Sequence, residues 1–141
     1  IPMPLKDCPF TFCGNGIYRP ILPIRIINPH TGGNYRTHGI IDTGADECAI
    51  PAAYAPILGH DLQAGQTKTI RTGNGLTAAY AHTTKFEIFH PKSAQPLYIM
   101  EDTPIDFLPN LNIVLLGVNS FLSRFILTID YPNKRFSIKY P

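Results

Sequence analysis

The residues best suited to chemistry lie in the segment 40–50, which reads Ile-Ile-Asp-Thr-Gly-Ala-Asp-Glu-Cys-Ala-Ile. Two bulky β-branched residues end an expected buried strand, and Asp42 follows them at once, so its carboxylate is presented at the strand end. Thr43 can hydrogen-bond to hold a tight loop, and Gly44 lets a backbone N–H approach the carboxylate because it has no Cβ. One Asp in this setting is ordinary, whereas two such carboxylates side by side share a proton and supply both a base and an acid.

Other residue types that often carry catalysis form no comparable group. The five histidines are dispersed, and no pair has the i, i+4 spacing of a helical zinc site, so the sequence predicts no metal. Ser120 and Ser123 lack the strand–turn–helix setting of a nucleophilic serine. Asp130 is followed by Tyr-Pro-Asn and is expected to cap a turn. Asp102 and Asp106 flank a Thr-Pro pair and are expected in a loop.

Composition limits the class of protein. The 141 residues suffice for one domain with a hydrophobic core and are too few for two. The formal net charge is only +2 and the basic residues are scattered, which argues against a nucleic acid partner. No apolar stretch approaches the roughly 18 residues of a membrane span, and no secretory signal is evident. These features lean weakly to the cytoplasm, and a leader or anchor ahead of Ile1 stays open.

The three cysteines, Cys8, Cys13 and Cys48, are expected to be free or buried thiols, because an odd number is a poor disulfide framework. A bridge between Cys8 and Cys13 is the alternative in an oxidising compartment. Metal binding is not expected, since the spacing is not C-x-x-C and no histidine lies near it.

Short strands separated by turns are expected to position the Asp42 loop. The 14 prolines and 11 glycines divide the chain into short segments, a pattern that favours strands over helices. One strand is expected at residues 21–27, and the returning strand at 35–41 would deliver the chain to Asp42. Gly73-Asn74-Gly75 lies between two β-prone runs, and Asn-Gly in that position is the strongest short-range signal for a hairpin. Further strands are expected at residues 85–89, 97–100, 112–116, 125–129 and 135–140, with helical turns near residues 51–58 and 119–124.

The sequence thus predicts a mostly β protein, a small closed or partly closed β-barrel with one or two short helices. Residues 1–16 are rich in Pro, Gly and Cys and are expected to form an irregular arm ahead of it.

The motif Asp42-Thr43-Gly44-Ala45, preceded by apolar residues and followed by an acid, resembles the active-site motif of the retropepsin-like aspartic proteases. The hairpin at 73–75 lies where that family has its flap. Val114-Leu115-Leu116-Gly117 resembles the element that crosses behind the active-site loop, residues 119–122 resemble the short helix, and residues 127–138 resemble the terminal hairpin. The resemblance divides the chain into an N-terminal arm, residues 1–17, and a retropepsin-like domain, residues 18–141.

The resemblance implies an aspartic endopeptidase that acts on peptides or proteins as a homodimer, with no cofactor and no metal. Asp42 of each subunit would be catalytic and would be braced by Thr43 and Gly44. The second carboxylate would come from a second copy, because the chain has one such loop and no internal repeat. The residues that the resemblance assigns to substrate binding are Ala45, Asp46, Gly73, Asn74 and Gly75.

One position departs from the family pattern. Viral members carry an Arg directly after the second Gly, where it pairs with the acid that follows Asp-Thr-Gly-Ala. This chain has Val118 there, which leaves Asp46 without that partner and identifies the chain as a divergent, non-viral member. A second function stays open, because fold alone does not imply activity: a catalytically inactive module that binds extended peptides or only dimerises. The intact motif favours the protease.

Overall fold

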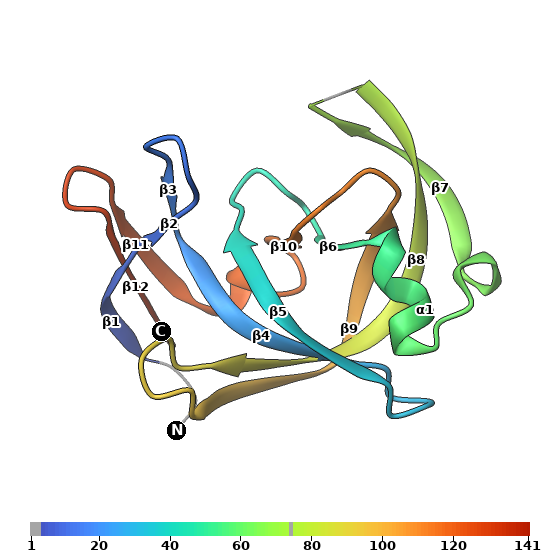
Figure 1. The fold of residues 1–141 in the computed structure, drawn as a ribbon, viewed down its shortest axis with the longest axis horizontal. Helices are drawn as coiled ribbons and strands as arrows, with labels where there is room; N and C mark the ends of the chain where they lie inside the picture. Colours follow the sequence, from blue (N-terminus) through green and yellow to red (C-terminus); the bar gives the residue numbers. More distant parts are fainter. Residues whose placement is uncertain (1–3, 74) are drawn as a thin grey trace.

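The computed structural model describes residues 4–73 and 75–141, and strands dominate it (Figure 1). Strands hold 55% of the residues and helical turns 10%, which confirms the prediction of a mostly β protein. Six strands form a hydrogen-bonded ring in the order β4–β5–β10–β6–β9–β8, and β8 pairs back with β4 to close it. Their bounds are Ile21–Ile27 for β4, Asn34–Ile41 for β5, Val114–Leu116 for β10, Cys48–Pro51 for β6, Pro96–Leu108 for β9 and Gly75–Phe89 for β8.

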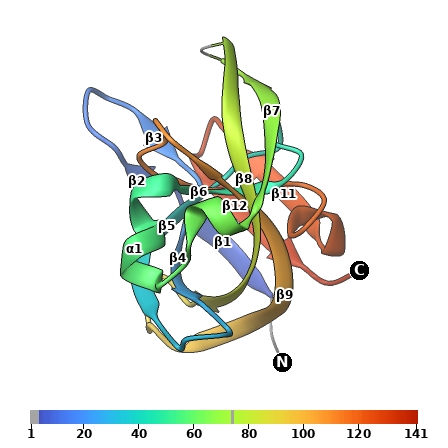
Figure 2. The same cartoon turned by 90° about the vertical axis from the view of Figure 1, so that its right-hand side faces the viewer.

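A hairpin projects from this ring. Among the described strands, β7, Gln66–Thr72, pairs with β8 alone, in an antiparallel register that places Thr72 opposite Gly75. Both views show the β7–β8 hairpin extending beyond the remaining strands (Figures 1 and 2). The predicted hairpin around residues 73–75 is therefore confirmed, although its central residue, Asn74, lies outside the described residues.

The core follows the period-two alternation of the ring strands. Along β4, every second residue from Leu22 to Ile26 is completely buried, and the residues between them are partly exposed. The same pattern places Phe86 and Ile88 of β8 in one hydrophobic cluster with them. Strand β10 is short and lies between β5 and β6, parallel to β5 and antiparallel to β6. This arrangement holds the end of β5, and with it Asp42, at the middle of the sheet.

A second, three-stranded sheet joins the two ends of the chain. It has the order β1–β12–β11, with bounds Leu5–Pro9, Arg135–Lys139 and Ile126–Asp130. The expectation of an irregular segment over residues 1–16 is therefore wrong for β1, which packs Leu5 and Cys8 opposite Ile138 and Phe136. A bulge between Leu5 and Cys8, with Asp7 at a φ of 51°, breaks the period-two pattern and hides this strand in the sequence. Strands β2, Thr11–Phe12, and β3, Tyr18–Arg19, form a small hairpin beyond it.

Helical turns are few and short. They comprise α1 (Ala55–Leu58) and three 3-10 turns, η1 (Ala52–Tyr54), η2 (Leu62–Ala64) and η3 (Leu122–Arg124). The expected turns after Pro51 and after Gly117 are thus confirmed. In the part of the chain that the structure describes, no helix has the length and hydropathy that crossing a bilayer requires.

Two long strands replace several predicted short ones. Strand β8 runs without a break through residues 76–82, the β-prone run that follows Gly75, and through residues 85–89, which were expected as a separate strand. Strand β9 continues through Asp102, Pro104 and Asp106, so the loop predicted there is wrong. Proline has no backbone N–H to donate to a neighbouring strand. Pro104 is tolerated because β9 pairs there with β8 alone, since its pairing with β6 begins at Ile105.

Candidate active site

Asp42 directly follows the last residue of β5. In the parallel ladder between β5 and β10, Ile41 lies opposite Leu116. The N–H of Ile41 donates to the Pro20 carbonyl at 2.9 Å, and the N–H of Asp42 donates to the Leu116 carbonyl at 3.1 Å. Hydrogen bonds to neighbours on both sides therefore fix the backbone at the point where the carboxylate emerges.

Backbone donors inside the turn orient the Asp42 side chain. The N–H of Gly44 donates to Asp42 Oδ1 at 2.9 Å, and the N–H of Ala45 donates to the Asp42 carbonyl at 3.3 Å. A Cβ on residue 44 would lie 3.4 Å from the same carboxylate oxygen, which is an ordinary van der Waals contact, so this approach does not itself require the glycine. Asp42 is half-buried, whereas Thr43 and Gly44 are exposed. The carboxylate is held by the backbone and remains accessible to solvent.

The residues after β10 brace the Asp42 loop from its other side. The N–H of Val118 donates to the Ala45 carbonyl at 2.9 Å, and the N–H of Asn119 donates to the Asp46 carbonyl at 2.7 Å. Gly117 permits this approach, because a Cβ there would lie 2.9 Å from the Ala45 carbonyl oxygen and closer still to the backbone of Glu47. The second apolar-apolar-Gly element thus packs directly on the loop.

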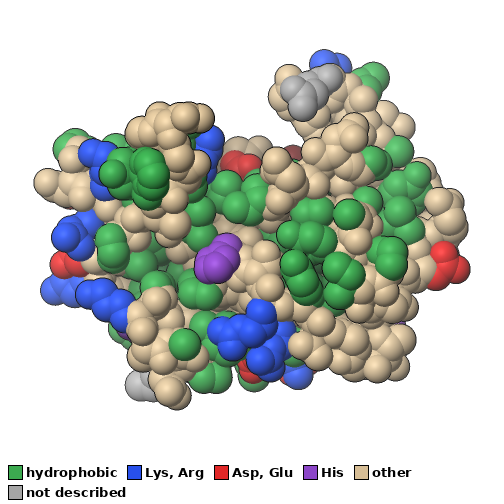
Figure 3. Space-filling model, viewed as in Figure 1, with side chains coloured by type: hydrophobic (Ala, Val, Ile, Leu, Met, Phe, Trp, Pro, Cys, Tyr) green, Lys and Arg blue, Asp and Glu red, His purple; other side chains and the backbone are tan. Residues whose placement is uncertain are grey.

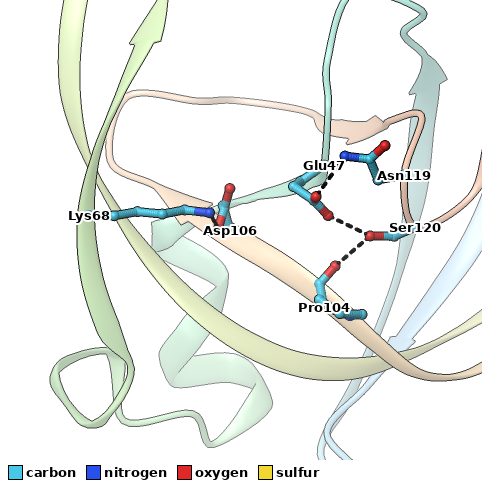
Figure 4. A network of polar contacts seen from close by, with 6 residues as sticks. All are labelled: Glu47, Lys68, Pro104, Asp106, Asn119 and Ser120. Carbon is cyan, nitrogen blue, oxygen red and sulfur yellow. Dashed lines mark hydrogen bonds and ion pairs between the residues drawn. The ribbon is translucent and has the colours of Figure 1, made fainter.

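Glu47, rather than Asp46, provides the side-chain link between the loop and this segment (Figure 4). Its carboxylate accepts hydrogen bonds from Asn119 Nδ2 at 3.1 Å and from Ser120 Oγ at 2.7 Å. The Ser120 hydroxyl also lies 3.0 Å from the Pro104 carbonyl of β9. Asp46 is exposed, and within residues 4–73 and 75–141 its carboxylate takes part in no hydrogen bond or ion pair. The acid that anchors the loop in this chain is therefore one position later than the acid that does so in viral members of the family that the sequence resembles.

A cavity of about 790 Å³ lies between the Asp42 loop and the β7–β8 hairpin. The space-filling view shows the surface hollowed beside the projecting hairpin (Figure 3). Of the residues predicted for the site, those that line this cavity are Asp42, Gly44, Ala45, Asp46 and Gly73. Thr43 and Gly75 do not line it, and Asn74 lies outside the described residues.

Sequence reasoning missed six polar residues of the cavity wall, which are Glu47, Lys68, Arg71, Thr72, Asp106 and Asn119. Lys68 Nζ lies 3.1 Å from Asp106 Oδ1 and so connects the hairpin to β9 (Figure 4). The available signal was the run Ile-Asp-Phe-Leu at residues 105–108, which is typical of a buried strand. The Thr-Pro pair before it suggested a loop instead.

Two of the three cysteines are buried thiols. Cys48 is completely buried at the start of β6, and burial raises the pKa of its thiol to about 11, so it stays protonated near neutral pH. Cys8 is also buried, and burial raises the pKa of its thiol as well. Cys13 is exposed, and all three are free in the described part of the chain.

The remaining acids and histidines form no second centre. Asp130 caps its turn as predicted, accepting from Asn133 Nδ2 at 2.8 Å and from the Asn133 N–H at 3.1 Å, and these hydrogen bonds lower the pKa of the carboxyl. Among the residues described, no group of three or more His, Cys, Asp or Glu side chains is arranged to hold a metal ion.

Comparison with known proteins identifies the architecture. No family model and no curated protein matches the sequence. Among solved structures, the chain is similar to a retropepsin-like aspartic protease from Rickettsia conorii, with 26% sequence identity and a TM-score of 0.55. The similarity covers 85% of this chain and 92% of the Rickettsia chain. Because the ring of strands, the Asp-Thr-Gly loop and the hairpin above the cavity occur in one chain with this similarity, the protein has a retropepsin-like fold.

Proposed function

We propose that this chain is the subunit of a homodimeric aspartic endopeptidase in which Asp42 of each subunit forms the catalytic pair. The observation that carries the proposal is the position of Asp42 on the wall of the 790 Å³ cavity, fixed by the sheet and oriented by the Gly44 N–H. The chain contains one Asp-Thr-Gly loop, so the second carboxylate has to come from another molecule. Identical chains most simply pair about a two-fold axis.

The chemistry follows from two carboxylates that share one proton around a water molecule. The ionised carboxylate accepts a proton from the water as its oxygen attacks the scissile carbonyl carbon. The protonated carboxyl donates to the carbonyl oxygen, which becomes the hydroxyl of a tetrahedral intermediate. When the intermediate collapses, the C–N bond breaks, the carboxyl that took the water proton donates it to the amide nitrogen, and the other carboxylate takes back the proton of one hydroxyl as the carbonyl of the product acid forms. The protein forms no covalent bond to the substrate, and the roles of the two Asp42 residues are exchangeable.

In this proposal Thr43 braces the pair. Its side chain is exposed, and its hydroxyl donates to no group in residues 4–73 and 75–141. Because it lies beside Asp42 on the exposed side of the loop, it is available to hydrogen-bond with the loop of a second subunit. Gly44 contributes by the N–H that orients the carboxylate.

The β7–β8 hairpin would cover the bound peptide. Lys68 and residues 70–73 of the hairpin line the same cavity as Asp42. In the described part of the chain, β7 makes its backbone pairing with β8, and the Lys68–Asp106 ion pair is a further link to β9. A two-stranded hairpin held mainly through one strand can move as a unit, close over a substrate and exclude water.

The test is hydrolysis of a reduced, alkylated and therefore unfolded protein by the wild-type chain and by Asp42→Asn. We expect fragments from the wild type and none from the variant, with both proteins equally folded by circular dichroism. If the wild type produces no fragments but binds extended peptides as well as Asp42→Asn does, the chain is an inactive peptide-binding module instead.

A further inference from the structure

The ion pair between Lys68 and Asp106 joins two very differently buried charges. The Asp106 side chain is 8% exposed, whereas the Lys68 side chain is 44% exposed. A buried carboxylate without a counter-charge is strongly unfavourable, because it loses its hydration and gains nothing in return. A half-exposed ammonium gains little from pairing, because water solvates it nearly as well. Asp106 therefore depends on a cation, and Lys68 does not depend on Asp106.

The strand registers show that Lys68 reaches Asp106 across the cavity-facing side of β8. Asp106 pairs with Ala81 of β8, and Lys68 pairs with Ala79 two residues earlier, so all four side chains lie on one face of the sheet. The β8 residues that pair with Lys68 and Asp106 are both alanines, whose short side chains leave the two long side chains free to meet at 3.1 Å. Ala49 of β6 also pairs with Asp106 and is buried on this face. The carboxylate is thus set in a floor of small apolar side chains.

Asp106 also lies where two cavities meet. A second cavity of about 370 Å³ shares four residues with the larger one, and these are Glu47, Lys68, Asp106 and Asn119. Movement of the Lys68 ammonium toward solvent would leave room there for a long side chain of a bound peptide.

Resting on the proposed function, we propose that Asp106 is a specificity-determining residue that selects substrates with a basic side chain, Lys or Arg. The cation of the substrate replaces the Lys68 ammonium on Asp106, and Lys68 turns into water. An acidic substrate side chain cannot make the corresponding exchange, because binding Lys68 would leave Asp106 buried and unpaired.

The other charges on these walls favour the same choice. The carboxylate of Glu47 lines both cavities and is held by two neutral donors, Asn119 and Ser120, so it adds negative potential. The nearby cations, Arg71 and Arg124, are exposed. Arg124 donates to the Tyr98 hydroxyl at 3.4 Å and lies on the wall of the smaller cavity only. The least solvated charges are therefore negative.

The first test measures binding without turnover, using the full chain with Asp42→Asn. The peptides are extended sequences of Ala and Leu. In each series one position carries Lys, norleucine or Glu, and that position differs from series to series. At one position we expect the Lys peptide to bind about tenfold more tightly than the norleucine peptide, equivalent to about 1.4 kcal/mol. The Glu peptide should bind more weakly than either. Equal affinities at every position, or a preference for Glu, would overturn the proposal.

Two further substitutions assign the effect. Asp106→Asn should remove the preference for Lys, while Lys68→Met should strengthen it, because the peptide then meets a carboxylate with no competing cation. Lys68→Met should also lower the melting temperature of the free protein, and the Lys peptide should restore it, whereas the norleucine peptide should not. If Asp106→Asn does not fold, recovery of the Lys68→Met melting temperature by the Lys peptide tests the proposal by itself. A Lys68→Met protein that gains neither affinity nor stability from the Lys peptide contradicts the proposal.

Activity separates this inference from the function on which it rests. If the wild-type chain cleaves the peptides without any preference for Lys, the proposed protease function stands and the proposed role of Asp106 is wrong. Selective binding of the Lys peptide without cleavage by the wild type supports Asp106 as a basic subsite and contradicts the protease.

Discussion

The Ser120 hydroxyl faces two acceptors, the Glu47 carboxylate at 2.7 Å and the Pro104 carbonyl at 3.0 Å, with a single proton to donate. It can satisfy only one of them at a time. The other donor to Glu47 is the side-chain amide of Asn119, at 3.1 Å. The link between the Asp42 loop and β9 therefore runs through Ser120, whose two acceptors, Glu47 and Pro104, compete for one hydroxyl proton.

Substitution of Glu47 tests this link. In Glu47→Gln, the new amide N–H₂ donates to Ser120 and frees its hydroxyl for Pro104, while the amide oxygen still accepts from Asn119. We expect this variant to be at least as stable as the wild type and to keep its hydrolytic activity. Glu47→Ala removes the charged acceptor of Asn119 and Ser120, although the Ser120 hydroxyl can still donate to Pro104, and it should lose about 1–3 kcal/mol of unfolding free energy, together with activity. The measurement is urea unfolding at neutral pH.

Asp46→Ala is the matched control for stability. The carboxylate of Asp46 in the wild type takes part in no hydrogen bond or ion pair within residues 4–73 and 75–141. Its removal should therefore change the unfolding free energy by no more than about 0.5 kcal/mol. A larger loss from Asp46→Ala than from Glu47→Ala would show that the anchoring acid has been misassigned.

Gly117→Ala should disturb the Asp42 loop from behind. The added methyl group would meet the backbone at Ala45 and Glu47, which cannot move aside as a flexible side chain could. We expect a loss of about 1–3 kcal/mol in unfolding free energy, as for overpacked cores, and a matching loss of peptide hydrolysis. Gly73→Ala provides the comparison for stability, because no atom of the described residues beyond its chain neighbours lies within 4 Å of the added Cβ. Equal melting temperatures for the two variants would contradict the packing argument.

The Asp42 loop could be predicted because its information is local. Residues 40–50 are contiguous, and the strand end, the acid and the glycine can be recognised without knowing their neighbours. Glu47 contacts Asn119 and Ser120, which lie 72 and 73 positions later in the sequence, so no pattern near Glu47 indicates these contacts. The Lys68–Asp106 pair is likewise formed only by the alignment of β7, β8 and β9.

Strand errors have equally physical causes. Pro104 looks like a strand breaker, and it is harmless only because the neighbouring strand starts one residue later. Asp7 adopts a positive φ in a bulge, which interrupts the alternation that would have indicated β1. Both features depend on which strand lies alongside, and this is a property of the tertiary fold.

Stability should fall in mild acid because of His60. Its ring packs against His82 and Phe107, with centroids 5.1 and 5.3 Å away, and its buried Nε2 has no hydrogen-bond partner among the described residues. Burial, and then the charges of His82 and His30, lower the pKa of His60 below its usual value. The unfolded chain therefore binds a proton more readily than the folded one.

The sign of the effect follows from that difference. Neutral His60 contributes stability that is fully present above the unfolded pKa, about 6.5, and is lost as the pH falls through the folded pKa. We expect His60→Phe to flatten the dependence of unfolding free energy on pH in this window, relative to the wild type. Parallel curves for the two proteins, measured by urea unfolding at several pH values, would exclude His60 as the cause.

The last prediction concerns the shared active site. If each active unit takes one Asp42 from each of two chains, specific activity should fall on dilution below the dimer dissociation constant. Concentration series of the wild type, with light scattering at the same concentrations, should place the fall in activity where the dimer dissociates. Thr43→Val, which removes the exposed hydroxyl beside Asp42, should move that midpoint to higher concentration because it weakens pairing across the axis.

Mixing provides the decisive form of this test. Excess Asp42→Asn should inhibit the wild type, because a mixed dimer has only one Asp42 carboxyl group and cannot supply both the acid and the base. With nine variant chains for each wild-type chain and random pairing, about one tenth of the wild-type chains still meet another wild-type chain, so activity should fall about tenfold. A variant that also lacks the ability to pair should leave the activity unchanged, which controls for substrate depletion by the added protein. A strictly monomeric preparation that hydrolyses peptides at constant specific activity, unaffected by Asp42→Asn, would show that the second carboxylate lies within the same chain. Asp106, the buried acid on the same cavity wall, would then be the first residue to examine.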